Sequence, residues 1–288
     1  MFFTTYKTTL KTLVRSFLLW IVIGVALFIV MSNAMSVNVS YTIVENGLPV
    51  KQVLDTDPEF VLTRTSSIQT YVNGTVCWVM LYVIPVFCVV AVMTVLSRDY
   101  SDSFFEIQKS NGLKLFTDFI SKLLAILTIN IIVYLALIYI SINYYYFSRG
   151  GVAELTITEH LVDNITRITR MFITSALPAI LFYTLLTYML GSMLKSGFAA
   201  GAFGSGYVLF VYCAEGVLRS KLPEEYHLYL TPASDVPYRY WAFYGTEWFE
   251  STRNPYTENQ VLIWLGIMLI SIVAFGTITF ICTKRRIT

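Results

Sequence analysis

The chain has 288 residues, of which 56% are hydrophobic and 13% are charged, and its formal net charge is +2. Soluble domains carry about 25% charged residues, so this composition excludes a water-soluble globule and predicts a membrane protein. The small basic excess gives no reason to expect nucleic-acid binding.

The chain begins with an amphipathic segment over residues 2–16, which we expect to form an interfacial helix leading into the first span. Its apolar face comprises Tyr6, Leu10, Leu13, Val14 and Phe17, and its opposite face comprises Lys7, Lys11 and Arg15. The first 35 residues also fit a secretory signal peptide, but five further apolar runs favour an uncleaved span.

Six apolar runs predict an all-α, polytopic membrane protein with one transmembrane domain over 1–288, because each span needs roughly 20 apolar residues. The runs are 17–31, 76–96, 123–142, 171–194, 197–214 and 261–282. Lys and Arg are denser on the side of the two termini, which predicts that both termini are cytoplasmic. Lys122 and Glu215 fall at span ends, so mid-span ionisable groups are scarce and a proton-coupled transporter is disfavoured.

Three segments are then expected on the outer side, at 32–75, 143–170 and 215–260. In the first, alternating apolar residues around Asn46-Gly47 favour a small extracytoplasmic β-hairpin. The third carries an unusually aromatic stretch, which offers a candidate substrate path at Tyr240, Trp241, Tyr244 and Trp248. The alternative is that these rings simply rest at headgroup depth.

The longest inner segment, 98–116, predicts a short helix at about 99–110. Its charged stripe is expected to face water and comprises Asp99, Asp102, Glu106 and Lys109. Asn111-Gly112 ends the helix before the third span. The alternative interpretation of this stripe is an ordinary solvated face.

Small residues recur every four positions at Gly197, Gly201 and Ser205, which predicts close packing of two helices. Gly201–Gly206 lacks the Lys-Ser/Thr of a phosphate-binding loop. The two histidines, His160 and His227, lack zinc-type spacing. We therefore predict no catalytic residue, cofactor site or metal site in this chain, which would not itself be an enzyme.

The order of these parts resembles a type 2 ABC transporter permease, the transmembrane subunit of an ABC exporter. The matching parts are the interfacial helix 2–16, the inner helix Asp99–Ser110, the short turn Lys195-Ser196 and the outer segment 215–260. The sequence Glu106-Ile-Gln-Lys-Ser-Asn-Gly112 followed by Lys122 is also similar to the family's acid, small-residue break and lysine before the third span. The segment 32–75 is long for compact members of this class.

The resemblance implies that the inner helix is a coupling helix on which a separate cytoplasmic ATPase docks. The coupling residues would be Asp99, Asp102, Glu106, Lys109 and Gly112. ATP and Mg would be bound by the ATPase, and a second permease chain, identical or homologous, would complete the transporter. We expect such a protein in a bacterial plasma membrane, exporting a hydrophobic or amphipathic substrate such as a peptide or antibiotic.

Two functions of other classes remain as alternatives. One is a non-transporting membrane sensor or immunity protein that binds a peptide through its outer segments. The other is an intramembrane enzyme, which would need an essential polar residue at membrane depth, where the sequence offers almost none.

Overall fold

The computed structural model describes residues 2–36, 40–45, 48–54, 79–101, 114–148, 169, 172–223 and 258–285. The helices are α1 (Phe2–Val14), α2 (Phe17–Ser36), α4 (Ile84–Ser101), α6 (Leu115–Ser148), α8 (Leu177–Leu194), α9 (Gly197–Arg219) and α12 (Glu258–Arg285). Single π-helical turns, Val79–Val83 and Phe172–Ala176, lead into α4 and α8. Two strands, β1 (Ser40–Glu45) and β2 (Leu48–Leu54), follow α2.

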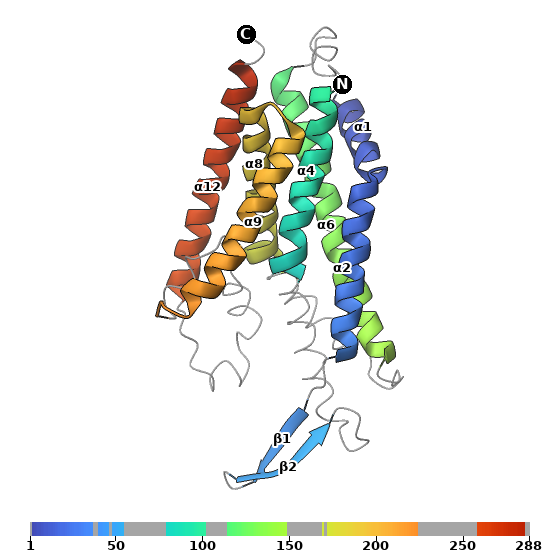
Figure 1. The fold of residues 1–288 in the computed structure, drawn as a ribbon, viewed down its shortest axis with the longest axis vertical. Helices are drawn as coiled ribbons and strands as arrows, with labels where there is room; N and C mark the ends of the chain where they lie inside the picture. Colours follow the sequence, from blue (N-terminus) through green and yellow to red (C-terminus); the bar gives the residue numbers. More distant parts are fainter. Residues whose placement is uncertain are drawn as a thin grey trace.

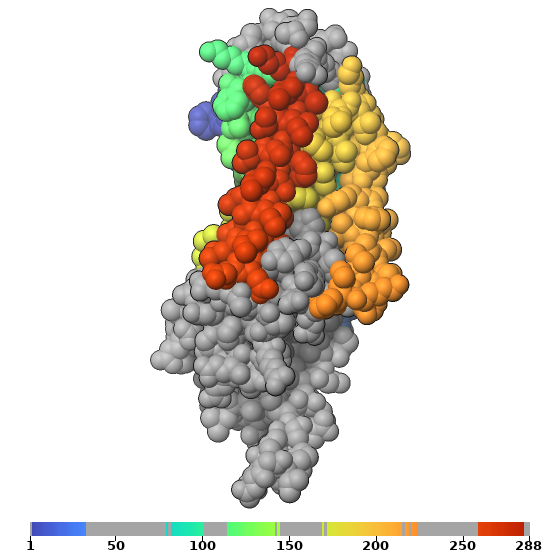
Figure 2. All heavy atoms as spheres, turned by 90° about the vertical axis from the view of Figure 1, so that its left-hand side faces the viewer, coloured from blue at the N-terminus to red at the C-terminus, as the bar shows by residue number. Residues whose placement is uncertain are grey.

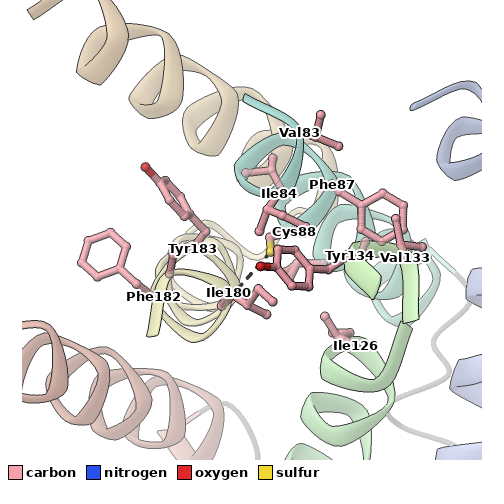
Figure 3. Packing of buried hydrophobic residues seen from close by; sticks show 14 of the residues in the cluster. Val83, Ile84, Phe87, Cys88, Ile126, Val133, Tyr134, Ile180, Phe182 and Tyr183 are labelled. Atoms are coloured by element: carbon pink, nitrogen blue, oxygen red, sulfur yellow. Dashed lines mark hydrogen bonds between the residues drawn. The ribbon is translucent and has the colours of Figure 1, made fainter. Parts of the chain in front are cut away.

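The long helices form an elongated bundle with both chain termini at one end, here called the termini end (Figure 1). Helix α8 packs against α4, α9 and α12, while α1 and α2 pack against α6 and α4. Figure 2 shows the face of the bundle formed by α12, α8 and α9. The hydrophobic core lies between α4, α6 and α8, with Phe87, Tyr134 and Ile180 among its fully buried side chains (Figure 3).

Four described helical segments are long and apolar enough to cross a membrane by themselves, which fits a multi-pass membrane protein. They are Leu115–Ser141, Phe172–Leu194, Gly197–Ala214 and Asn259–Lys284. Helix α2 joins this set only together with α1, across a bend of 57°. The total of six spans therefore stays a prediction. In it, α2 and α4 would be the two spans beyond these four.

The third helix begins earlier than its apolar run indicated. The sequence placed the span at 123–142, whereas α6 begins at Leu115 and includes Asp118 and Lys122 in its first two turns. The physical reason is that these two charges pair within the bundle, so they do not end the helix.

The turn between α8 and α9 consists of Lys195 and Ser196 alone. Lys195 adopts the left-handed conformation (φ 54°, ψ 33°) that ends α8 and reverses the chain. Ser196 then caps α9, because its hydroxyl accepts a hydrogen bond from the Ala199 amide at 3.2 Å. Helices α8 and α9 therefore form a helical hairpin with only these two residues between them.

Glycines of α9 allow this helix to approach α4 closely. A Cβ at Gly197 would overlap the backbone of Ser97, and one at Gly201 would overlap the side chain of Met93. The third member of the predicted series, Ser205, is half-buried, while a Cβ at Gly204 would lie 3.1 Å from Val89. Because a helix turns every 3.6 residues, Gly204 continues this face better than Ser205.

The two strands pair antiparallel, with Tyr41 opposite Val53 and Glu45 opposite Leu48. The register shifts between Ile43 and Val44. In Figure 1 the strands lie at the end of the molecule opposite the termini end.

Helix α1 packs against the bundle through part of its apolar face and through threonines beside that face. Its buried residues are Thr5, Thr9 and Leu13. Val14 and Phe17, assigned to the apolar face, are 47% and 77% exposed. Of the predicted apolar face, Leu13 is buried and Tyr6 and Leu10 are half-buried, so this face is divided between the bundle and the surface.

Candidate functional site

A buried charge cluster lies at the termini end, where α4 ends and α6 begins. The Lys122 ammonium group is 2.7 Å from Asp99 Oδ2 and 2.6 Å from Asp118 Oδ2. Lys122 is fully buried, and Asp99 and Asp118 are only 4% and 5% exposed. Three ionisable side chains therefore meet inside the helix bundle.

Two of these residues are placed by helix geometry alone. Asp118 and Lys122 are four residues apart on α6, so their side chains lie on the same face and reach each other. Asp118 lies in the first turn of α6, where the helix dipole favours a negative charge. Asp99 comes from the last turn of α4, so the contact that it makes with Lys122 ties α4 to α6.

The cluster is electrically balanced once Arg98 is included. The charge of the Arg98 guanidinium attracts the Asp118 carboxylate, so two cations face two carboxylates. Such balance matters because a buried charge without a partner costs several kcal/mol. The Oδ1 atoms of Asp99 and Asp118 have no hydrogen-bond partner among the described residues, so these carboxylates rely heavily on Lys122.

The cluster is also connected to α1 and α8. The Arg98 guanidinium donates a hydrogen bond to the Thr12 hydroxyl of α1. Phe119, beside Asp118, packs edge-to-face on Tyr188 of α8 with ring centroids 5.5 Å apart. Helices α1, α4, α6 and α8 are therefore connected by contacts of the paired charges or of residues next to them in the sequence.

A second set of buried polar side chains lies between α4, α6 and α8, and Figure 3 shows one of them, Cys88. The Cys88 thiol donates a hydrogen bond to Asn130 Oδ1 at 3.1 Å, and Asn130 Nδ2 donates to the Ile126 carbonyl at 2.8 Å. Thr184 and Thr187 of α8 are fully buried as well. The prediction that polar groups are almost lacking at membrane depth is therefore wrong.

This second group offers hydrogen bonds between helices rather than chemistry. No base or charged residue of the described chain bonds to Cys88 there. In the described parts of the chain no three His, Cys, Asp or Glu side chains gather as a metal site would require. Neutral polar contacts of this kind hold membrane helices together, typically contributing about 0.6 kcal/mol each.

An apolar groove of about 420 Å³ runs along α8 and α9. Its lining includes Leu186 and Leu190 of α8 and Phe203, Tyr207 and Phe210 of α9. Apart from the Tyr207 hydroxyl these side chains offer no hydrogen bond. The groove therefore suits a hydrocarbon chain better than a polar ligand.

Of the predicted coupling residues, the structure describes only Asp99, and it corrects the expected position. Asp99 was expected in a water-facing stripe, but its carboxylate is buried against Lys122. The reason is that α4 continues to Ser101, so the last turn still packs against α6. The remaining predicted coupling and path residues lie outside the described residues: Asp102, Glu106, Lys109, Gly112, Tyr240, Trp241, Tyr244 and Trp248.

Sequence reasoning missed the cluster as a unit, although one signal for it was present. The spacing of Asp118 and Lys122 is that of a helical ion pair, which the assignment of Lys122 to a span end obscured. No local pattern links either residue to Asp99, because that contact depends on how α4 and α6 pack.

Comparison of the sequence with models of known protein families and with curated protein sequences gives no match.

Proposed function

We propose that this chain is the permease subunit of an ATP-driven transporter of the ABC type. The observation that carries the proposal is the buried charge cluster. It joins the last turn of α4 to the first turns of α6, which are the two helix ends that flank the inner segment proposed as the coupling helix.

A coupling element needs rigid attachments, because a push on a loosely held loop is lost in local motion. A buried ion pair suits this role, since separating its partners costs about 3–5 kcal/mol. A displacement applied between α4 and α6 would therefore move both helices together. Through Thr12 and Tyr188 it would also reach α1 and α8.

The distribution of charge supports a cytoplasmic location for the termini end. The described, solvent-accessible charges there are basic: Lys7, Lys11, Arg15, Lys114, Lys195 and Lys284. An excess of cations is typical of cytoplasmic ends. The proposed protein has six spans, its termini face the cytoplasm, and it resides in a bacterial plasma membrane.

The apolar groove along α8 and α9 favours a hydrophobic or amphipathic cargo, such as a peptide or antibiotic, although a lipid chain has the same chemistry. Two cytoplasmic ATPase subunits would bind ATP and Mg, and a second permease chain would complete the unit. No catalytic role is proposed for this chain.

The decisive experiment is purification from native membranes in mild detergent, followed by mass spectrometry of the bound proteins. We expect an ATPase to co-purify in equal number with the permease chain. Recovery of the chain alone under several mild conditions would refute the proposal and favour the sensor or immunity function.

A second experiment tests the role of the cluster within the complex. Lys122→Met should weaken the stimulation of ATP hydrolysis by cargo while leaving the ATPase bound. Lys114→Gln, an exposed lysine at the start of α6, is the matched control and should leave this stimulation unchanged. Equal effects of the two variants would show that the buried cluster has no special part in coupling.

A further inference from the structure

Helix α1 carries a line of exposed cations that form no ion pair with any described residue. Lys7, Lys11 and Arg15 are spaced four residues apart, so they follow one side of the helix, and all three are exposed. Like charges at this spacing destabilise a helix. Residues 1–44 contain no Asp or Glu, so the N-terminal region supplies no compensating charge of its own.

Contacts on the other side of α1 fix the direction in which these cations point. The Tyr6 hydroxyl donates a hydrogen bond to Thr128 Oγ1 of α6 at 3.1 Å. Ser16, after the end of α1, bonds to Thr94 of α4 at 3.3 Å. With Thr5 and Thr9 buried between these contacts, α1 cannot rotate to bring its cations into the bundle.

Exposed aromatic rings flank the cations. Phe3 and Phe17 are 74% and 77% exposed, and Trp20 is 57% exposed. The Trp20 indole donates a hydrogen bond to the Val14 carbonyl at 2.7 Å, across the bend between α1 and α2. Indole rings and cations placed together on a helix are typical of the boundary between lipid tails and headgroups.

The acidic residues that the structure describes at the termini end do not reach this surface. Asp99 and Asp118 are buried and paired with Lys122. In the described parts of this end, the other exposed charges are those of Lys114, Lys195 and Lys284. Among the described residues, the positive charge of α1 is therefore not balanced by acids, and an anionic partner outside the bundle would complement it.

We propose that α1 binds the headgroups of anionic phospholipids through Lys7, Lys11 and Arg15. The lipid phosphates neutralise the three cations, and the exposed aromatic rings enter the bilayer beside them. Each basic residue near an anionic surface contributes about 1 kcal/mol, which is roughly a fivefold change in affinity. Facing a bilayer, the three residues together would favour an anionic surface over a zwitterionic one by roughly 100-fold at low salt. This inference does not rest on the proposed transport function.

Native mass spectrometry of the full-length protein in detergent tests the proposal, with phosphatidylglycerol or phosphatidylcholine added as the probe. The unaltered protein should bind phosphatidylglycerol more tightly, and the preference should fall as salt increases. The variant with Lys7→Gln, Lys11→Gln and Arg15→Gln should lose most of that preference.

The control variant carries Lys114→Gln, Lys195→Gln and Lys284→Gln, which remove the same charge from the same end of the bundle. It should keep the preference for phosphatidylglycerol. Equal losses in the two variants would overturn the assignment to α1 and indicate a diffuse charge effect. Inorganic phosphate at roughly 10 mM, a concentration that screens charge only weakly, is added as a competitor. Full displacement of the lipid by this phosphate would show that a free anion is sufficient, and would overturn the lipid assignment.

Discussion

Replacement of Lys122 by Met removes the only cation that contacts both carboxylates of the buried cluster in the described structure. Met has a similar length and volume, so the change creates little cavity and isolates the effect of charge. Asp99 Oδ2 and Asp118 Oδ2 would lose a partner at 2.7 and 2.6 Å, and their Oδ1 atoms already lack one among the described residues. Removing one partner of a buried ion pair lowers the free energy of unfolding by about 3–5 kcal/mol.

Thermal unfolding of the detergent-solubilised protein measures this cost. For a chain of this size, 1 kcal/mol shifts Tm by about 2–4 °C, so the variant should melt roughly 10 °C lower. The triple variant Lys122→Met, Asp99→Asn, Asp118→Asn removes the three buried charges, leaves only the half-buried Arg98, and should recover most of the loss. If the triple variant melts as low as the single one, the residues matter for packing alone and the electrostatic reasoning is refuted.

Two further variants test the packing of the bundle. Gly197→Val should lower Tm, because its side chain would collide with Ser97 and overpacking costs about 1–3 kcal/mol. Gly206→Val, where nothing lies within 4 Å of an added Cβ, is the matched control and should not lower Tm. Asn130→Leu should lower the free energy of unfolding by about 1 kcal/mol, because the Cys88 thiol loses its acceptor and the Ile126 carbonyl loses its side-chain donor. An unchanged unfolding curve for Asn130→Leu would show that these hydrogen bonds carry no net stability.

The sequence predicted the helices well, because each of the six apolar runs corresponds to one. The tight turn at Lys195 and Ser196 was also readable, since two polar residues separate two apolar runs and a glycine follows. The start of α6 could not be predicted, because Asp118 and Lys122, considered one by one, look like residues at the end of a span. Their inclusion depends on pairing, and hydropathy alone takes no account of pairing.

The site was harder to predict than the fold for a related reason. Asp99 belongs by spacing to a charged stripe, and a local pattern cannot show that α6 brings a lysine to it. The polar contacts of α1 escaped prediction in the same way. A pattern of apolar residues cannot show that Thr5 and Thr9 are buried, or that Thr12 accepts a hydrogen bond from Arg98 of α4.

The contrast between Lys122 and the cations of α1 shows what decides where a cation lies at this end of the bundle. Lys122 is buried because two carboxylates meet it, and attraction between charges is far stronger away from water. Lys7, Lys11 and Arg15 have no acid within residues 1–44, so burial would leave them unpaired, and they stay at the surface. The end therefore combines a neutral, rigid interior with a cationic exterior. In the proposed transporter, the interior would transmit displacement from α4 to α6 and α8, while α1 would hold the same end against an anionic bilayer.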